Sequence, residues 1–104
     1  MGKTTGEAKA AARVIALPAD FRLGSVAQVK AELIGAFDAA AAQLDGAGVE
    51  RVDTAALQLL VAFRREAVAR GQSPTWLGVS EVMRDVAGML GLAQALELPA
   101  PMPA

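Results

Sequence analysis

The sequence predicts a small α/β domain, with one mixed sheet of four to five strands packed against about four helices. Segments with helical spacing alternate with short runs rich in β-branched residues, and a chain of 104 residues suits a single domain. The hydrophobic fraction is 54%, but 24 of these residues are alanines, so the core must be thin. We expect the domain over residues 12–98, between a disordered leader at 1–11 and a proline-rich tail at 99–104.

The first elements are predicted to form a small hairpin at the edge of the sheet. Residues 13–17 are mainly apolar with β-branched residues at their centre, and residues 18–20 have the composition of a turn. Residues 21–23 then alternate apolar and polar side chains. We therefore expect two short strands that run in opposite directions.

A helix follows this hairpin. Ser25 and Gln28 have the spacing of a capping box, in which the serine side chain accepts a hydrogen bond from the start of the helix. The apolar residues behind this signal recur at helical spacing and should face the core. They are Val26, Val29, Leu33, Ile34 and Phe37.

The middle of the chain is less clearly patterned. Residues 38–43 are nearly all alanine and fit either a helix or a strand, but residues 43–45 precede a glycine turn and predict a short buried strand. A further strand-like segment at 49–52 leads to Asp53 and Thr54, where the next helix begins.

The longest predicted helix covers residues 55–70, which contain no glycine or proline, and Gly71 is placed to end it. One face should be buried and the opposite face polar but small. The buried face comprises Ala56, Leu59, Leu60, Phe63 and Ala67. The opposite face comprises Thr54, Gln58 and Arg65, flanked by Ala55, Val61, Ala62 and Ala69. The second face is thus a shallow strip of methyl groups around one hydroxyl and one amide.

The last third of the chain predicts a strand at 75–79 and a helix capped by Ser80. Gly91 should end that helix, and residues 93–98 add another helical turn. The apolar residues expected to face inward are Val82, Met83, Val86, Met89 and Leu90.

Composition excludes several classes of function. Acidic and basic residues nearly cancel, at 11 against 10, so no charge excess indicates binding to nucleic acid or to an anionic membrane. Histidine, cysteine and tyrosine are absent, which removes disulfides, the usual metal ligands and Ser-His or Cys-His nucleophile pairs. The longest stretch without charge, residues 86–96, is far shorter than the ~20 residues that span a bilayer. We expect a cytoplasmic protein without a cofactor or metal.

Asp53 and Thr54 are the polar residues with the most informative position. Asp53 precedes a long helix, and we favour an N-cap over a catalytic role for it. A response-regulator function is rejected because it needs a neighbouring acidic pair and a later lysine, whereas the last lysine is Lys30. Thr54 either occupies the first helical turn or displays its hydroxyl to a partner or a kinase, and both interpretations stay open.

Other polar or aromatic residues are interpreted as structural. Arg64, Arg65 and Glu66 are predicted to form a solvated flank of the long helix. Trp76, the single tryptophan, is predicted to fill the core with its indole N–H satisfied.

Several of these features together resemble the STAS domain, a family named for sulfate transporters and anti-sigma factor antagonists. The resemblance covers roughly residues 12 to 98 and rests on short motifs at matching separations. They are Leu44-Asp45, Val49, Val52, Asp53-Thr54-Ala55-Ala56-Leu57, Gly71, Val79-Ser80 and Leu90-Gly91-Leu92. The resemblance implies a mixed sheet with packed helices and a non-enzymatic, partner-binding role.

The resemblance also implies what the Asp53 turn could do. In anti-anti-sigma members the turn reads Asp-Ser-Ser-Gly, and a kinase-type anti-sigma factor phosphorylates the second serine to switch off binding. That acceptor position is Ala55 here, and the glycine position is Ala56. Thr54 takes the place of the first serine and is the only hydroxyl left in the motif.

The Asp-Thr-Ala form is closer to the STAS subunit of bacterial phospholipid-transport ATPases, in which the same loop and helix dock on the ATPase subunit. It is also similar to stand-alone STAS proteins linked to chemotaxis or stress signalling. We therefore expect a docking face for another protein, whose residues are Asp53, Thr54, Ala55, Gln58, Ala62 and Arg65. The expected partner is a transporter ATPase subunit, an anti-sigma kinase or a chemotaxis or signalling protein.

Two alternatives remain beside this interpretation. The first is an anti-anti-sigma factor regulated by phosphorylation at Thr54. The second is a small-molecule enzyme or nucleotide binder, which the missing histidine, cysteine and phosphate-binding loop disfavour.

Overall fold

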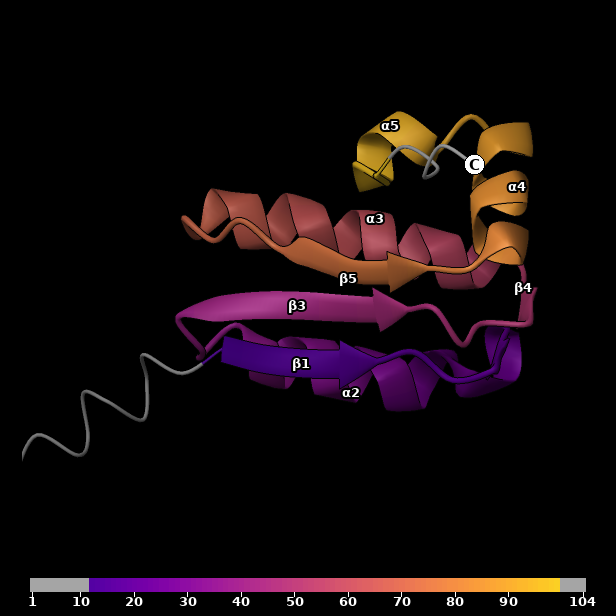
Figure 1. Cartoon of the computed structure of the whole chain (residues 1–104). Coiled ribbons are helices and arrows are strands. Elements are labelled where there is room, and N and C mark those ends of the chain that lie inside the picture. The colour runs from indigo at the N-terminus through magenta and orange to yellow at the C-terminus, as the bar shows by residue number, and fades with distance from the viewer. Residues whose placement is uncertain (1–11, 100–104) are drawn as a thin grey trace, which may run out of the picture.

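Three parallel strands form the central sheet of the computed structural model, which describes residues 12–99 (Figure 1). They are β1 (Ala12–Ala16), β3 (Ala41–Gly46) and β5 (Thr75–Val79), in the order β1-β3-β5. Two shorter strands, β2 (Asp20–Phe21) and β4 (Arg51–Val52), make a separate parallel pair. The predicted leader at 1–11 and residues 100–104 of the tail lie outside the described residues, so the domain limits stay a prediction.

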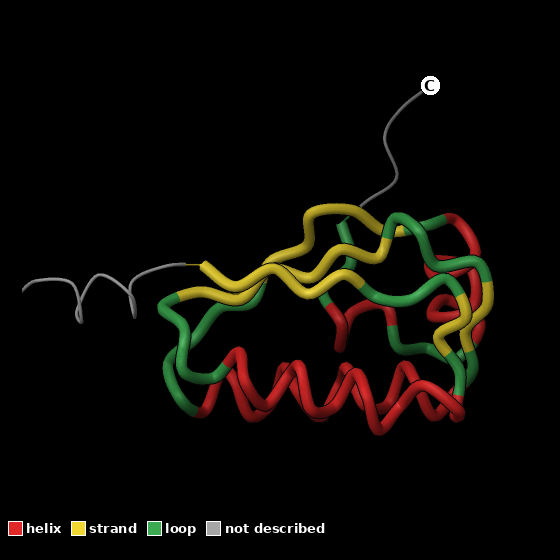
Figure 2. The backbone as a smooth tube through the Cα atoms, turned by 90° about the horizontal axis from the view of Figure 1, so that it is seen from below, coloured by secondary structure: helices red, strands yellow, loops and turns green. Residues whose placement is uncertain are grey.

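The helices pack on one side of this sheet and around its end. They are α2 (Val26–Ala36), which follows the 3₁₀ turn η1 (Leu23–Ser25), α3 (Thr54–Ala69), α4 (Glu81–Met89) and α5 (Ala93–Leu96). Figure 2 shows α2 and α3 running along the same face of the strands. Among residues 12–99 no helix covers the opposite face (Figure 2). Side chains alternate along a strand, so Val14 and Leu77, next to Ile15 and Trp76, point to that face, and they are 53% and 54% exposed. The predicted small α/β domain is confirmed, as a two-layer arrangement.

The core lies between this sheet and the helices. Ile15 pairs with Leu44, and Leu44 pairs with Trp76, so one row of side chains crosses all three strands. Ile15 and Leu44 are buried, as are Leu57, Leu60 and Phe63 of α3. The buried strand predicted at 43–45 is therefore confirmed and is longer than expected, because the alanines at 41 and 42 belong to it.

The predicted edge hairpin is wrong, because the segment after β1 does not turn back. The N–H of Leu17 donates to Asp45 O at 2.9 Å, so the chain continues beside β3. Ala19 O then accepts from the N–H groups of Glu50 and Arg51. The turn-like residues 18–20 carry the chain forward, and every strand pairing in residues 12–99 is parallel. The antiparallel component of the expected mixed sheet is thus not found in the described residues.

The start of α2 also differs from the capping box that the sequence predicts. The 3₁₀ turn η1 leads directly into the helix, so the backbone of Ser25 is already helical, at φ −101° and ψ −4°. Its hydroxyl donates to Asp20 O at 2.8 Å instead of accepting from the helix. The inward face is correct at Val29 and Leu33, but Ile34 is 54% exposed on the flank of the helix.

Both glycines predicted to end helices do so with positive φ, at +85° for Gly71 and +71° for Gly91. In each case the residue after the glycine donates back to the helix, from Gln72 to Ala67 O and from Leu92 to Ala87 O, both at 2.8 Å. This is the Schellman arrangement, in which glycine meets the left-handed conformation without a steric penalty.

Helix α4 buries less than its sequence predicts. Met83 and Ala87 are fully buried, whereas Val82, Met89 and Leu90 are 41%, 79% and 43% exposed. The helix stands across the end of the sheet (Figure 1), so only a narrow strip of it meets the core. Ser80 caps it as predicted, by accepting from the N–H of Met83 at 3.1 Å.

Trp76 has the structural role that the sequence predicts. Its ring is partly buried against the core, and its indole N–H donates to Leu96 O at 2.9 Å. This hydrogen bond ties β5 to α5, which is confirmed as the additional helical turn near the end of the domain.

Candidate docking face on helix α3

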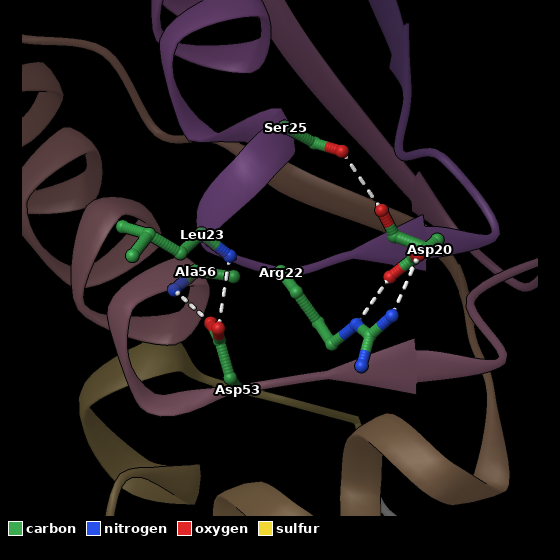
Figure 3. A network of polar contacts seen from close by, with 6 residues as sticks. All are labelled: Asp20, Arg22, Leu23, Ser25, Asp53 and Ala56. Carbon is green, nitrogen blue, oxygen red and sulfur yellow. Dashed lines mark hydrogen bonds and ion pairs between the residues drawn. The ribbon is translucent and has the colours of Figure 1, made fainter.

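The site begins at Asp53, where the chain leaves β4 and enters α3. The backbone of this residue is extended, and its Oδ1 accepts from the N–H of Ala56 at 2.9 Å. The N-cap predicted from the sequence is confirmed. The other oxygen, Oδ2, accepts from the N–H of Leu23 at 2.8 Å (Figure 3). The carboxylate thus joins the start of α3 to the start of η1, a contact across 30 residues that the sequence does not reveal.

A charged pair lies next to this connection. The guanidinium of Arg22 donates to the carboxylate of Asp20, with Nη2 at 2.9 Å from Oδ2 (Figure 3). This hydrogen bond holds the pKa of Asp20 below its usual value and raises the pKa of Arg22. Both side chains line an open hollow of 270 Å³ whose walls also include Asp53 and Ser25. Arg22 is therefore already paired within the hollow.

Helix α3 divides into the two faces that its spacing predicts. The residues of the inward face are buried, with Leu59 partly so. Along the opposite side Thr54, Gln58, Ala62 and Arg65 are all exposed. The structure therefore brings these four predicted residues onto one face. Asp53 and Ala55 are half-buried beside it, and the side chain of Asp53 turns back to the backbone.

Two hollows flank the centre of this face, and Ala62 borders both. The first, of 330 Å³, lies between α3 and the segment before α5, and its lining is Gln58, Val61, Ala62, Arg65 and Leu92. The second, of 160 Å³, is an apolar groove between α2 and α3. Leu92 and the α2 residues of this groove are missing from the predicted site, because their proximity to α3 depends on the tertiary fold.

Arg64 corrects the prediction of a solvated flank. Its side chain is buried, its Nη1 donates to Pro74 O at 3.1 Å, and its Nη2 lies 3.0 Å from Glu97 Oε1. Arg65 and Glu66 are exposed as predicted. The signal that could have identified Arg64 is its spacing, seven residues after the buried Leu57 and four after the buried Leu60. Arg64 thus links α3 to the C-terminal part of the fold.

Comparison with known proteins assigns the sequence to a family. The family model described as Mlab, STAS domain, matches residues 5–99. The chain belongs to the STAS domain family. No curated protein and no solved structure gives a match. STAS domains are in general non-enzymatic modules that mediate protein-protein interaction, and the exposed face of α3 is a surface suited to such a role.

The described part of this STAS domain offers neither a membrane span nor a carboxylate metal site. None of the helices between residues 12 and 99 is long and apolar enough to cross a membrane. Over the same residues, no cluster of three or more acidic side chains is arranged to hold a metal ion. The acidic residues Asp45 and Asp53 instead accept hydrogen bonds from backbone N–H groups.

Proposed function

We propose that this STAS domain is a non-enzymatic regulatory module that docks on another protein through the Asp53 turn and α3. The docking face consists of Asp53, Thr54, Ala55, Gln58, Ala62 and Arg65. The observation that carries the proposal is the exposure of Thr54, Gln58 and Ala62 at successive turns of a helix whose opposite side is buried. Such a face is stable in the isolated domain and available to a partner.

The size and chemistry of these side chains favour a close contact. Ala62 projects only a methyl group, so a partner helix could approach α3 at the short end of the usual 8–10 Å interaxial distance. Thr54 and Gln58 supply a hydroxyl and an amide that can orient the partner by hydrogen bonds. The bonds of Asp53 to Ala56 and Leu23 hold the first turn of α3 in place, so the face is preorganised.

The partner we favour is the ATPase subunit of a bacterial phospholipid transporter, with a chemotaxis or stress-signalling protein as the other possibility. The Asp53-Thr54-Ala55 sequence supports this choice, because it resembles the loop by which STAS subunits dock on such ATPases. A cytoplasmic location belongs to the same proposal.

A second candidate function is that of an anti-sigma factor antagonist regulated by phosphorylation of Thr54. Thr54 is exposed as the first residue of α3, where the unpaired N–H groups of a helix stabilise negative charge. Incubation with a cognate anti-sigma kinase and ATP, followed by intact mass measurement, tests this function. A mass without added phosphate removes it.

Affinity capture from the native cell tests the docking face. Thr54→Glu adds charge to the docking face, and Ala62→Arg adds bulk at the centre of this face. Both variants should fail to capture the partner, and circular dichroism should show that both are folded. Ala27→Arg is the matched control, because Ala27 is also an exposed helical alanine but lies on α2. Undiminished capture by both docking-face variants would contradict the proposal.

A further inference from the structure

The hollow beside Ala62 lies along α3. Its lining residues on this helix are Gln58, Val61, Ala62 and Arg65, whose spacing of three and four places them on adjacent ridges. From the first to the last of them the helix rises roughly 10 Å, or about two turns. Leu92 forms the other wall. We call this feature the Leu92 groove.

Charge within this groove has one sign. Arg65 is the only ionisable side chain among its lining residues, and no carboxylate of residues 12–99 lies within ion-pair distance of it. The neighbouring Arg64 is engaged by Glu97, and Arg70 is engaged by Glu66. These three arginines and two glutamates leave an excess of one positive charge on a chain whose net charge is −1.

The remaining walls are apolar or neutral. Val61 and Leu92 are both half-buried, so their outer surfaces are available to an apolar side chain. Gln58 closes one end with an amide that both donates and accepts hydrogen bonds. The groove therefore combines an apolar middle with a cationic end.

We propose that the Leu92 groove binds an amphipathic helix of the partner protein that places an acidic side chain against Arg65 and an apolar side chain between Val61 and Leu92. A helix fits because the groove follows the axis of α3 over two turns, and Ala62 permits close packing. Charge complementarity selects an acidic residue in the partner, since a basic residue there would be repelled by the positive charge of Arg65. The inference rests on the proposed function and names the chemistry of its partner.

A displayed library of helical peptides tests this chemistry directly, if each position varies among acidic, basic and apolar residues. Selection against the full chain should enrich peptides in which Asp or Glu lies one helical turn from an apolar residue. Arg65→Glu should weaken an enriched peptide by about tenfold or more, and Arg65→Gln by less. Lys30→Glu is the control, because it makes the same charge change in the apolar groove between α2 and α3 and should have little effect on peptide affinity. Affinity should also fall with added salt.

The outcomes separate this inference from the docking face itself. Some enriched peptides could lose binding to the Ala62→Arg variant and yet carry no excess of acidic residues, or still bind the Arg65→Glu variant. Such peptides would overturn the inference and leave the docking face standing. Peptides that tolerate Ala62→Arg would contradict the docking face. A selection that enriches no peptide would also overturn the inference. So would a dimer in analytical ultracentrifugation that Ala62→Arg dissociates, because the groove would then bind a second copy of this chain. Circular dichroism of each variant confirms that it is folded.

Discussion

Asp53 allows the sharpest test of how the docking face is built. An ordinary N-cap needs one acceptor, and asparagine serves as well as aspartate there. Asp53 uses two, because Oδ1 accepts from Ala56 N–H and Oδ2 from Leu23 N–H. In Asp53→Asn the amide nitrogen would replace one acceptor and meet a backbone N–H donor to donor. The variant should therefore lose one hydrogen bond and keep the other.

The expected cost follows from these two bonds. One hydrogen bond contributes about 1 kcal/mol to the free energy of unfolding, and loss of an N-cap costs a similar amount. Asp53→Asn should thus lower the stability by about 1 kcal/mol and Asp53→Ala by about 2 kcal/mol. For a domain of this size, 1 kcal/mol corresponds to a decrease of roughly 4–8 °C in the melting temperature.

Urea unfolding followed by circular dichroism gives the comparison. The control is Ser80, which caps α4 with a single bond to Met83 N–H, so Ser80→Ala should cost about 1 kcal/mol. If Asp53→Asn has the same free energy of unfolding as the wild type, the hydrogen bond to Leu23 N–H contributes nothing to stability. Asp53→Ala and Ser80→Ala with equal cost would lead to the same conclusion.

The remaining predictions concern other contacts of the fold. Arg64→Ala should cost about 2 kcal/mol in chemical unfolding, because it deprives Pro74 O of its donor, whereas Arg65→Ala should change stability little. Gly46→Ala should cost about 1–3 kcal/mol, since a Cβ there would lie 2.9 Å from Met83 Sδ and 3.3 Å from Gly78 O; Gly48→Ala, with open space around it, is its control. Because the pKa of folded Asp20 is lowered from 3.8 by Arg22, its contribution to stability is present above pH 3.8 and is lost as the pH falls through the folded pKa. Unfolding curves of the wild type and Asp20→Asn should therefore converge under acid, and a constant difference would contradict this linkage.

The elements that the sequence predicts correctly are those with a local cause. Gly71 and Gly91 end helices because glycine accepts positive φ, and Ser80 and Asp53 cap helices because their side chains reach the first N–H groups. The two faces of α3 follow from its period of 3.6 residues. The four exposed members of the docking face could be placed on one side of a helix for the same reason.

The elements that the sequence does not predict depend on distant contacts. Residues 18–20 have the composition of a turn, but pairing of Ala19 O with the N–H groups of Glu50 and Arg51 decides the direction of the chain. Ser25 donates to Asp20 O because the 3₁₀ turn already occupies the start of α2. Burial of Arg64 requires Pro74, just before β5, and Glu97, just after α5, both far along the chain. The same applies to Leu92 in the groove beside α3.

Site-specific photo-crosslinking tests the central claim of a docking face on α3. A benzophenone amino acid would replace Ala69, an exposed alanine that flanks the docking face, in one variant and Val14, on the uncovered side of the sheet, in another. After irradiation in the native cell, we expect a discrete crosslinked protein from position 69 that Thr54→Glu abolishes, and none from position 14. A crosslink from position 14 alone, or one from position 69 that persists with Thr54→Glu, would contradict the docking face.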